Sequence, residues 1–145
     1  MKSKNKLFLT FILLLLLVNG YYYIVPLFIS SDKNLEHEIA EMVLTSNDLV
    51  KSYNKDEKKS NALYAGKIIE ITGFVEKVSF LNNRNTIILK SNTENFGVIC
   101  DVHPNDFENL KELKENQKIR VKGICKGFLK DVILLNCSID LKPNE

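Results

Sequence analysis

The chain has 145 residues, which is enough for one domain of ordinary size and a leader segment. Its formal net charge is +2, but Lys2, Lys4 and Lys6 precede the first apolar run, and removing these three from the 20 basic residues leaves 17 against 18 acidic ones. This balance argues against a phosphate-binding protein, which needs clustered lysine and arginine.

Residues 7–29 carry no charge. As a helix they would reach about 30 Å, the thickness of the hydrocarbon core of a bilayer. Lysines before this stretch and acidic residues after it predict an N-terminal transmembrane anchor with its N-terminus in the cytoplasm and the rest of the chain outside, in the periplasm or on the outer surface. A signal peptide cut near Gly20 and a buried soluble helix are the two alternatives.

The chain after the leader divides at a polar run. From Asp32 to Tyr53 apolar residues recur three or four apart, which predicts an amphipathic helix. Residues 54–61 carry charges of both signs, which is typical of a solvated turn or a frayed helix end. We therefore divide the chain into residues 1–30 (anchor or signal segment), 31–60 (amphipathic helix and linker) and 61–145 (one further domain).

Five segments of that domain alternate apolar and polar residues as strands do: residues 67–78, 86–90, 96–102, 118–125 and 132–139. A short helix is predicted between the third and the fourth, because Asn105 and Glu108 have the spacing of a capping box behind Pro104. Three strands, a helix and two strands are the chain order of the OB-fold, a five-stranded Greek-key barrel. The predicted fold class is thus mainly β.

Particular residues on these strands resemble the bacterial tRNA-anti-like OB-fold family over roughly residues 35–140. They are Ala62, Tyr64, Gly66 and Lys67 before the first strand, Thr72 and Gly73 on it, Cys100 on the third, Lys122, Gly123 and Cys125 on the fourth, and Asn136 and Cys137 on the fifth. The resemblance implies the OB-fold, often behind a membrane-directed leader. It does not imply an activity, since a fold hosts many functions.

The cysteines and histidines do not form a recognisable metal motif. The gaps between Cys100, Cys125 and Cys137 are too long for the usual zinc-ligand pairs, and the alternation points all three into the barrel, where a thiol acts as a small apolar group. One disulfide between two of them remains an alternative. His37 and His103 are interpreted as surface or capping residues, so we expect no metal and no other cofactor.

A ligand site is sought on the first two strands, because OB barrels commonly stack bases on exposed aromatic side chains within a basic groove. The candidates are Phe74, Lys77, Phe80, Arg84 and Lys90. Phe74 is equally consistent with packing against the N-terminal helix. Residues 61–145 hold 12 basic and 11 acidic side chains, which is little charge for a nucleic-acid groove.

No serine-histidine-aspartate set, nucleophile elbow or recognisable carboxylate pair is present in the sequence, so an enzyme is not expected. We expect a membrane-tethered, extracytoplasmic OB-fold binding module, attached through residues 7–29. Its partner would be another envelope protein, or a small or polymeric ligand, on the face of the first three strands. The alternative is a cytoplasmic protein that binds single-stranded nucleic acid, such as tRNA or single-stranded DNA.

Overall fold

The computed structural model describes residues 10–22, 35–81 and 84–141, and the chain splits into two compact units, Met1–Asp32 and Lys33–Glu145. In the first unit, residues 10–22 form a helix whose side chains are largely exposed. Across the three described ranges, the structure contains no helix that combines the length and the apolar character needed to cross a membrane. Residues 7–9 and 23–29 of the predicted anchor lie outside the described residues.

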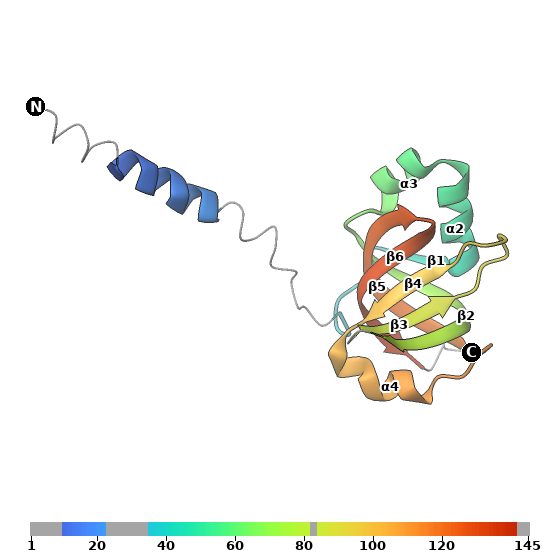
Figure 1. Cartoon of the computed structure of the whole chain (residues 1–145). Coiled ribbons are helices and arrows are strands. Elements are labelled where there is room, and N and C mark those ends of the chain that lie inside the picture. The colour runs from blue at the N-terminus through green and yellow to red at the C-terminus, as the bar shows by residue number, and fades with distance from the viewer. Residues whose placement is uncertain (1–9, 23–34, 82–83, 142–145) are drawn as a thin grey trace, which may run out of the picture. The chain divides into compact units, whose positions relative to one another are not determined.

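The second unit is built on a closed five-stranded barrel (Figure 1). Its strands are β2 (Ile68–Leu81), β3 (Arg84–Leu89), β4 (Val98–Val102), β5 (Lys118–Leu129) and β6 (Asp131–Asp140). They neighbour one another in the order β2-β3-β4-β6-β5, and β5 pairs again with β2 to close the barrel. Only β4 and β6 run parallel among these barrel pairs of the described chain. All five predicted strands and the OB-fold order are confirmed.

The barrel strands form because apolar residues recur at every second position. On β2, Ile69, Ile71, Gly73 and Val75 are buried, whereas the residues between them are half-buried or exposed. The same alternation runs along β5 from Ile119. Each strand therefore contributes one face to a single core, as a small barrel requires.

The segment before the barrel differs from the prediction. Met42–Thr45 is a strand, β1, which pairs in parallel with β2, so one continuous helix from Asp32 to Tyr53 is wrong for these residues. Two helices follow, α2 (Ser46–Lys55) and α3 (Glu57–Tyr64). The predicted turn over residues 54–61 is thus mostly helix. Its charges mislead because they occupy the exposed sides of helices whose other sides are buried. The proposed domain limits at residues 30 and 60 stay predictions.

Side chains explain where these helices begin. The Thr45 hydroxyl accepts the Asp48 N–H at 3.1 Å, and the Asp56 carboxylate accepts the Lys59 N–H at 2.9 Å, so each helix has an N-cap of a preferred residue type. From α2, Leu49, Val50 and Tyr53 enter the barrel core. The Tyr53 ring stacks on Phe128 of β5 at 5.7 Å. The two helices therefore cover one end of the barrel (Figure 1).

The opposite end carries a single turn of 3₁₀-helix, η1 (Pro104–Asp106), and then α4 (Phe107–Glu112). The cap is His103, whose Nδ1 accepts the Asn105 N–H at 3.2 Å, so Asn105 is not the cap that the sequence predicts. The capping role expected for His103 is confirmed. Asn116 is left-handed at φ 64° and lies four residues beyond the end of α4.

The three cysteines belong to the core. Cys100, Cys125 and Cys137 are buried and free, which confirms their predicted inward direction. A Cβ placed on Gly123 would lie 2.6 Å from the Cys137 sulfur, closer than real atoms approach. A Cβ on Gly73 would lie 2.8 Å from the Ser46 hydroxyl. These two glycines are therefore needed for close packing, and not for a ligand.

Candidate ligand-binding face

The strand register shows which predicted site residues lie together. The Lys90 N–H donates to the Phe74 carbonyl at 2.8 Å, which places these two residues side by side on β2 and β3. Lys77 is the partner of Ile88, and Arg84 pairs with Leu81 at the hairpin end. Paired residues point to the same side of a sheet, and the alternating positions Val75 and Leu89 point into the core.

Four of the five candidates, Phe74, Lys77, Arg84 and Lys90, consequently share the outer face of the β2–β3 hairpin. The Phe74 side chain is 52 % exposed, so it is not covered by a helix as the alternative interpretation required. Phe80 lies on the other face, where its ring meets that of Phe107 edge-on at 5.9 Å. Phe80 is thus part of the contact with α4 and not of the outer face.

An apolar row crosses the outer face from strand to strand. Ile88 of β3 is paired with Ile99 of β4, and Ile99 with Ile133 of β6. Each of these three side chains is partly exposed. Outer positions of a barrel are usually polar, so a row of isoleucines there provides an apolar platform on which a ligand can lie.

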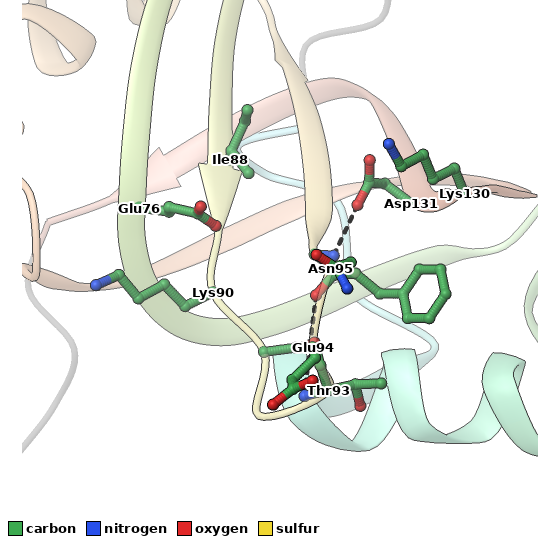
Figure 2. Close-up of a pocket in the computed structure, with 11 residues that line it drawn as sticks. Glu76, Ile88, Lys90, Thr93, Glu94, Asn95, Lys130 and Asp131 are labelled. Atoms are coloured by element: carbon green, nitrogen blue, oxygen red, sulfur yellow. Dashed lines mark hydrogen bonds between the residues drawn. The ribbon is translucent and has the colours of Figure 1, made fainter.

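A pocket of about 500 Å³ opens beside this row (Figure 2). Its walls come from β2, β3, the β3–β4 loop and the β5–β6 turn, and its lining includes Glu76, Ile88, Lys90, Glu94, Asn95, Lys130 and Asp131. Figure 2 shows Glu76 and Lys90 on one side and Lys130 and Asp131 on the other. The volume is within the range of small-ligand sites.

Hydrogen bonds fix the β3–β4 loop that forms one wall. The Gly97 N–H donates to the Asp131 carboxylate at 2.7 Å, which ties the loop to the β5–β6 turn. The Ser91 hydroxyl donates to the Phe96 carbonyl at 2.5 Å within the loop. A Cβ at position 97 would lie 2.8 Å from the Leu89 carbonyl oxygen, so glycine is required there. The wall is therefore preorganised before any ligand arrives.

The charges of the outer face and the pocket nearly balance. The cations are Lys77, Arg84, Lys90, Lys130 and Lys118, the partner of Phe74 on β5, and the carboxylates are Glu76, Glu94, Asp101 and Asp131, which gives a net charge of +1 (5 − 4). The Lys90 ammonium also donates to Asn116 at 2.6 Å. Such a surface does not attract a polyanion strongly. It offers hydrogen-bond donors on cationic side chains and hydrogen-bond acceptors on anionic ones.

A second polar pocket, of about 240 Å³, lies on the far side of the barrel between β2, β5 and β6. Its cationic side chains already have partners within the protein. Arg120 forms an ion pair with Glu70 at 3.3 Å. The Lys122 ammonium donates to the backbone carbonyls of Glu36 and Glu38 at 3.2 and 2.6 Å. These contacts hold the chain that leads into β1, and we assign this pocket a structural role.

Sequence reasoning missed the loop and turn that complete the first pocket. Residues 91–95 only connect two predicted strands, and Lys130–Asp131 carries no motif. Two signals were available. Gly97 directly follows this segment, and Asp131 directly precedes the strand predicted from residue 132. Neither indicates that the loop and the turn meet, because 34 residues separate the partners of their hydrogen bond.

Comparison with known proteins agrees with this architecture. The family model of tRNA_anti-like proteins matches residues 1–139. The chain belongs to the tRNA_anti-like family. No curated protein matches it. The resemblance expected from the strand motifs is therefore confirmed, and with it the assignment of the barrel as an OB-fold.

Solved structures share the fold at low sequence identity. A lipoprotein of Klebsiella pneumoniae, described as a candidate nucleic acid-binding protein, is 10 % identical at a TM-score of 0.57, over 68 % of this chain and 90 % of that one. The Stn1–Ten1 complex of S. pombe is 14 % identical at a TM-score of 0.41, over 53 % and 60 %. An OBody bound to hen egg-white lysozyme is 12 % identical at 0.43, over 53 % and 84 %.

Proposed function

We propose that this chain is a non-enzymatic binding module that holds its ligand on the outer face of β3 and β4 and in the adjoining pocket. One observation supports the proposal above the others: the 500 Å³ pocket lies against β3 and the β5–β6 turn. These elements correspond to the second strand and to the loop between the fourth and fifth strands of an OB-fold, where such barrels bind oligonucleotides and oligosaccharides.

The chemistry of the surface favours a ligand that is uncharged or carries charges of both signs. The apolar row Ile88–Ile99–Ile133 supplies contact area, and the nearly balanced charges around it supply oriented hydrogen bonds. A small or polymeric ligand, or a segment of another envelope protein, fits this combination. The lining side chains recognise groups and hold them in place, so we assign binding and not catalysis.

Tethering to a membrane is the second part of the proposal, and it rests on the sequence. Residues 7–29 lack charge, and lysines precede them. These features favour an anchor with a cytoplasmic N-terminus and an extracytoplasmic barrel. A reporter fused after Leu141 would test on which side of the membrane the barrel lies. We expect activity from a reporter that works only in the periplasm. Activity from a reporter that works only in the cytoplasm would contradict the proposed location.

Photo-crosslinking from defined positions in living cells tests the binding face. A photoreactive residue in place of Thr93, in the pocket wall, should give a discrete adduct. The matched control is Glu57, which is exposed on α3 at the other end of the barrel. Adducts from both positions alike, or from Glu57 alone, would contradict the assignment of the face.

Binding of single-stranded nucleic acid is the second candidate function. Phe74, Lys77 and Arg84 share one outer face, as a stacking platform with cations would. The description of the structurally similar Klebsiella pneumoniae lipoprotein points the same way. The nearly balanced charge argues against it. Retention on a single-stranded oligonucleotide at low salt, weakened by Phe74→Ala but not by Leu63→Ala, would support this function, and no retention at about 50 mM salt would exclude it.

A further inference from the structure

The end of the β2–β3 hairpin is apolar on both of its faces. Phe80 and Leu81 are consecutive residues, so their side chains point to opposite sides of the strand, and they are 51 % and 69 % exposed. Phe107 of α4, 37 % exposed, lies against Phe80. A strand that is apolar on both faces is normally covered on both faces. We call these three residues the hairpin-end patch.

This patch projects beyond the body of the barrel. The last pair between β3 and β4 joins Thr86 to Asp101, whereas β2 and β3 continue their own pairing to Leu81 and Arg84. The outermost residues of the hairpin therefore have no strand beside them on the β4 side. Large apolar side chains at such a projecting position mark an interaction site more often than an isolated exposed leucine does.

The position of the patch points to its partner. The parallel strands β4 and β6 finish at the same end of the barrel, and α4 with Phe107 follows β4 there (Figure 1). Glu36 lies beside Asp140 at the finish of β6, since both line one pocket. The chain that connects to the leader therefore reaches the barrel at the end that carries the patch.

The connection to the leader is short. Five residues separate position 29, the end of the uncharged stretch, from Leu35, which is buried in the second unit. The six Cα–Cα steps from position 29 to Leu35 span at most about 22 Å, even when fully extended. If residues 7–29 anchor the chain, as the proposed function holds, this length is the upper limit on the distance from the anchor to the point where the chain enters the barrel.

We propose that the hairpin-end patch is a second membrane contact, which inserts into the headgroup region of the bilayer to which the leader tethers the chain. Aromatic and aliphatic side chains with a neighbouring cation suit this interface. Arg84 supplies the cation next to Leu81. Lys111 lies 4.9 Å from the centre of the Phe107 ring and pairs with Glu108 at 2.7 Å. The net charge around the patch is thus small, so the membrane contact depends on insertion of the apolar side chains.

Because the leader tethers the chain, a patch of this size is sufficient to hold the hairpin end on the membrane. A patch of three side chains would hold a free protein on a membrane only weakly, but the leader converts the contact into an intramolecular one at high effective concentration. With the leader and the hairpin end both in the bilayer, the barrel has two attachment points. The pocket beside the β5–β6 turn, at the start of β6, is then directed away from the membrane.

The absence of tryptophan from the sequence provides a clean test. Leu81→Trp and, separately, Phe80→Trp give the full chain a single tryptophan at the patch. Leu129→Trp is the matched control, because Leu129 is 78 % exposed at the last position of β5, at the opposite end of the barrel from the patch. Each variant is reconstituted into phosphatidylcholine–phosphatidylglycerol vesicles with or without brominated acyl chains, and far-UV circular dichroism verifies its fold.

We expect blue-shifted emission and at least threefold stronger quenching by brominated lipid for the two patch variants than for Leu129→Trp. Equal quenching at both ends would overturn the inference. Blue-shifted emission without quenching would also overturn it, and would indicate that a second copy of the chain covers the patch. If quenching is absent while the chain resists a carbonate wash, the patch contact fails and the tether stands. If the wash removes the chain, the tether itself fails.

Discussion

Replacing Gly123 with alanine tests the tightest contact in the barrel core. The added Cβ would lie 2.6 Å from the Cys137 sulfur, where ordinary contact begins at 3.4 Å, a shortfall of 0.8 Å. Both residues are buried, and the new Cβ would also lie 3.1 Å from Leu134 Cβ and 3.3 Å from the Leu135 carbonyl oxygen. The added methyl group therefore has no free space to move into. Overpacking of this kind costs about 1–3 kcal/mol of unfolding free energy.

A variant at Cys137 tests whether this cost comes from the contact with its sulfur. Cys137→Ala alone should destabilise the fold by about 1 kcal/mol through a small cavity. In the double variant the alanine at position 123 takes up space that the sulfur vacates. The two effects should therefore fall short of additivity by about 1 kcal/mol or more, since contacting residues couple.

Denaturant unfolding of the four proteins by far-UV circular dichroism, in detergent and with a thiol reductant, measures this coupling. In thermal scans each kcal/mol corresponds to roughly 4–8 °C for a small domain. If the effects of Gly123→Ala and Cys137→Ala add within about 0.5 kcal/mol, the contact between β5 and β6 is not as close as described, and the structural account of this glycine is refuted.

Three further results are expected. Burial raises the pKa of the Cys137 thiol above its usual 9.0, with a contribution from a hydrogen bond to Cys100. The contribution of this thiol to stability should therefore be constant below about pH 9 and be lost as the unfolded thiol ionises above it, and pH-dependent unfolding should show a shallower fall above about pH 9 for Cys137→Ala. Ser46→Ala removes a 2.6 Å donor to the Lys90 carbonyl and should cost about 1–2 kcal/mol in denaturant unfolding, whereas an unchanged midpoint would disprove that bond. Asp131→Ala should speed hydrogen exchange at the Gly97 amide at least tenfold by NMR, with a distant amide such as that of Val121 unaffected.

The barrel was predictable because its signals are local and repeat. Each strand alternates buried and exposed residues, and the interruption by the α4 segment marks the OB-fold order without any knowledge of pairing. The inward direction of Cys100 and Cys137 follows from the same alternation. Family motifs agree with this reading because several of their residues, Gly123 and Cys137 among them, meet in the core.

The segment Met42–Thr45 shows where local signals fail. Its residues fit a helical stripe when read with those that follow, but they form a parallel strand because β2 has a free edge beside Ile69 and Thr72. Strand pairing with a segment more than twenty residues away outweighs a weak helical preference. The edge of β2 is a property of the closed barrel, so the sequence of this segment alone does not contain it.

The candidate site was predictable in part for the same reason. Residues on one hairpin, such as Phe74 and Lys90, can be paired from their spacing around a turn. The apolar row Ile88–Ile99–Ile133 cannot, because alternation places each isoleucine on the outer side of its own strand, but only the register between the strands shows that the three are neighbours. A β-bulge between Val75 and Lys77 also shifts the outer face by one residue, so strict alternation misplaces Lys77.

The two ends of the barrel differ in a way that bears on function. At the α2 end, Tyr53 stacks on Phe128 and is buried, and its hydroxyl lies 3.4 Å from the Cys125 sulfur, so this end is sealed by aromatic packing. At the α4 end, the large side chains of the hairpin remain exposed. Core residues at the sealed end can change little without cost. Ligand specificity should therefore vary through residues 92–95 and Lys130, which are not part of the core. Exchanging residues 92–95 between family members should transfer ligand preference while leaving the unfolding midpoint within a few degrees. A loop exchange that alters stability but not preference would place the ligand elsewhere.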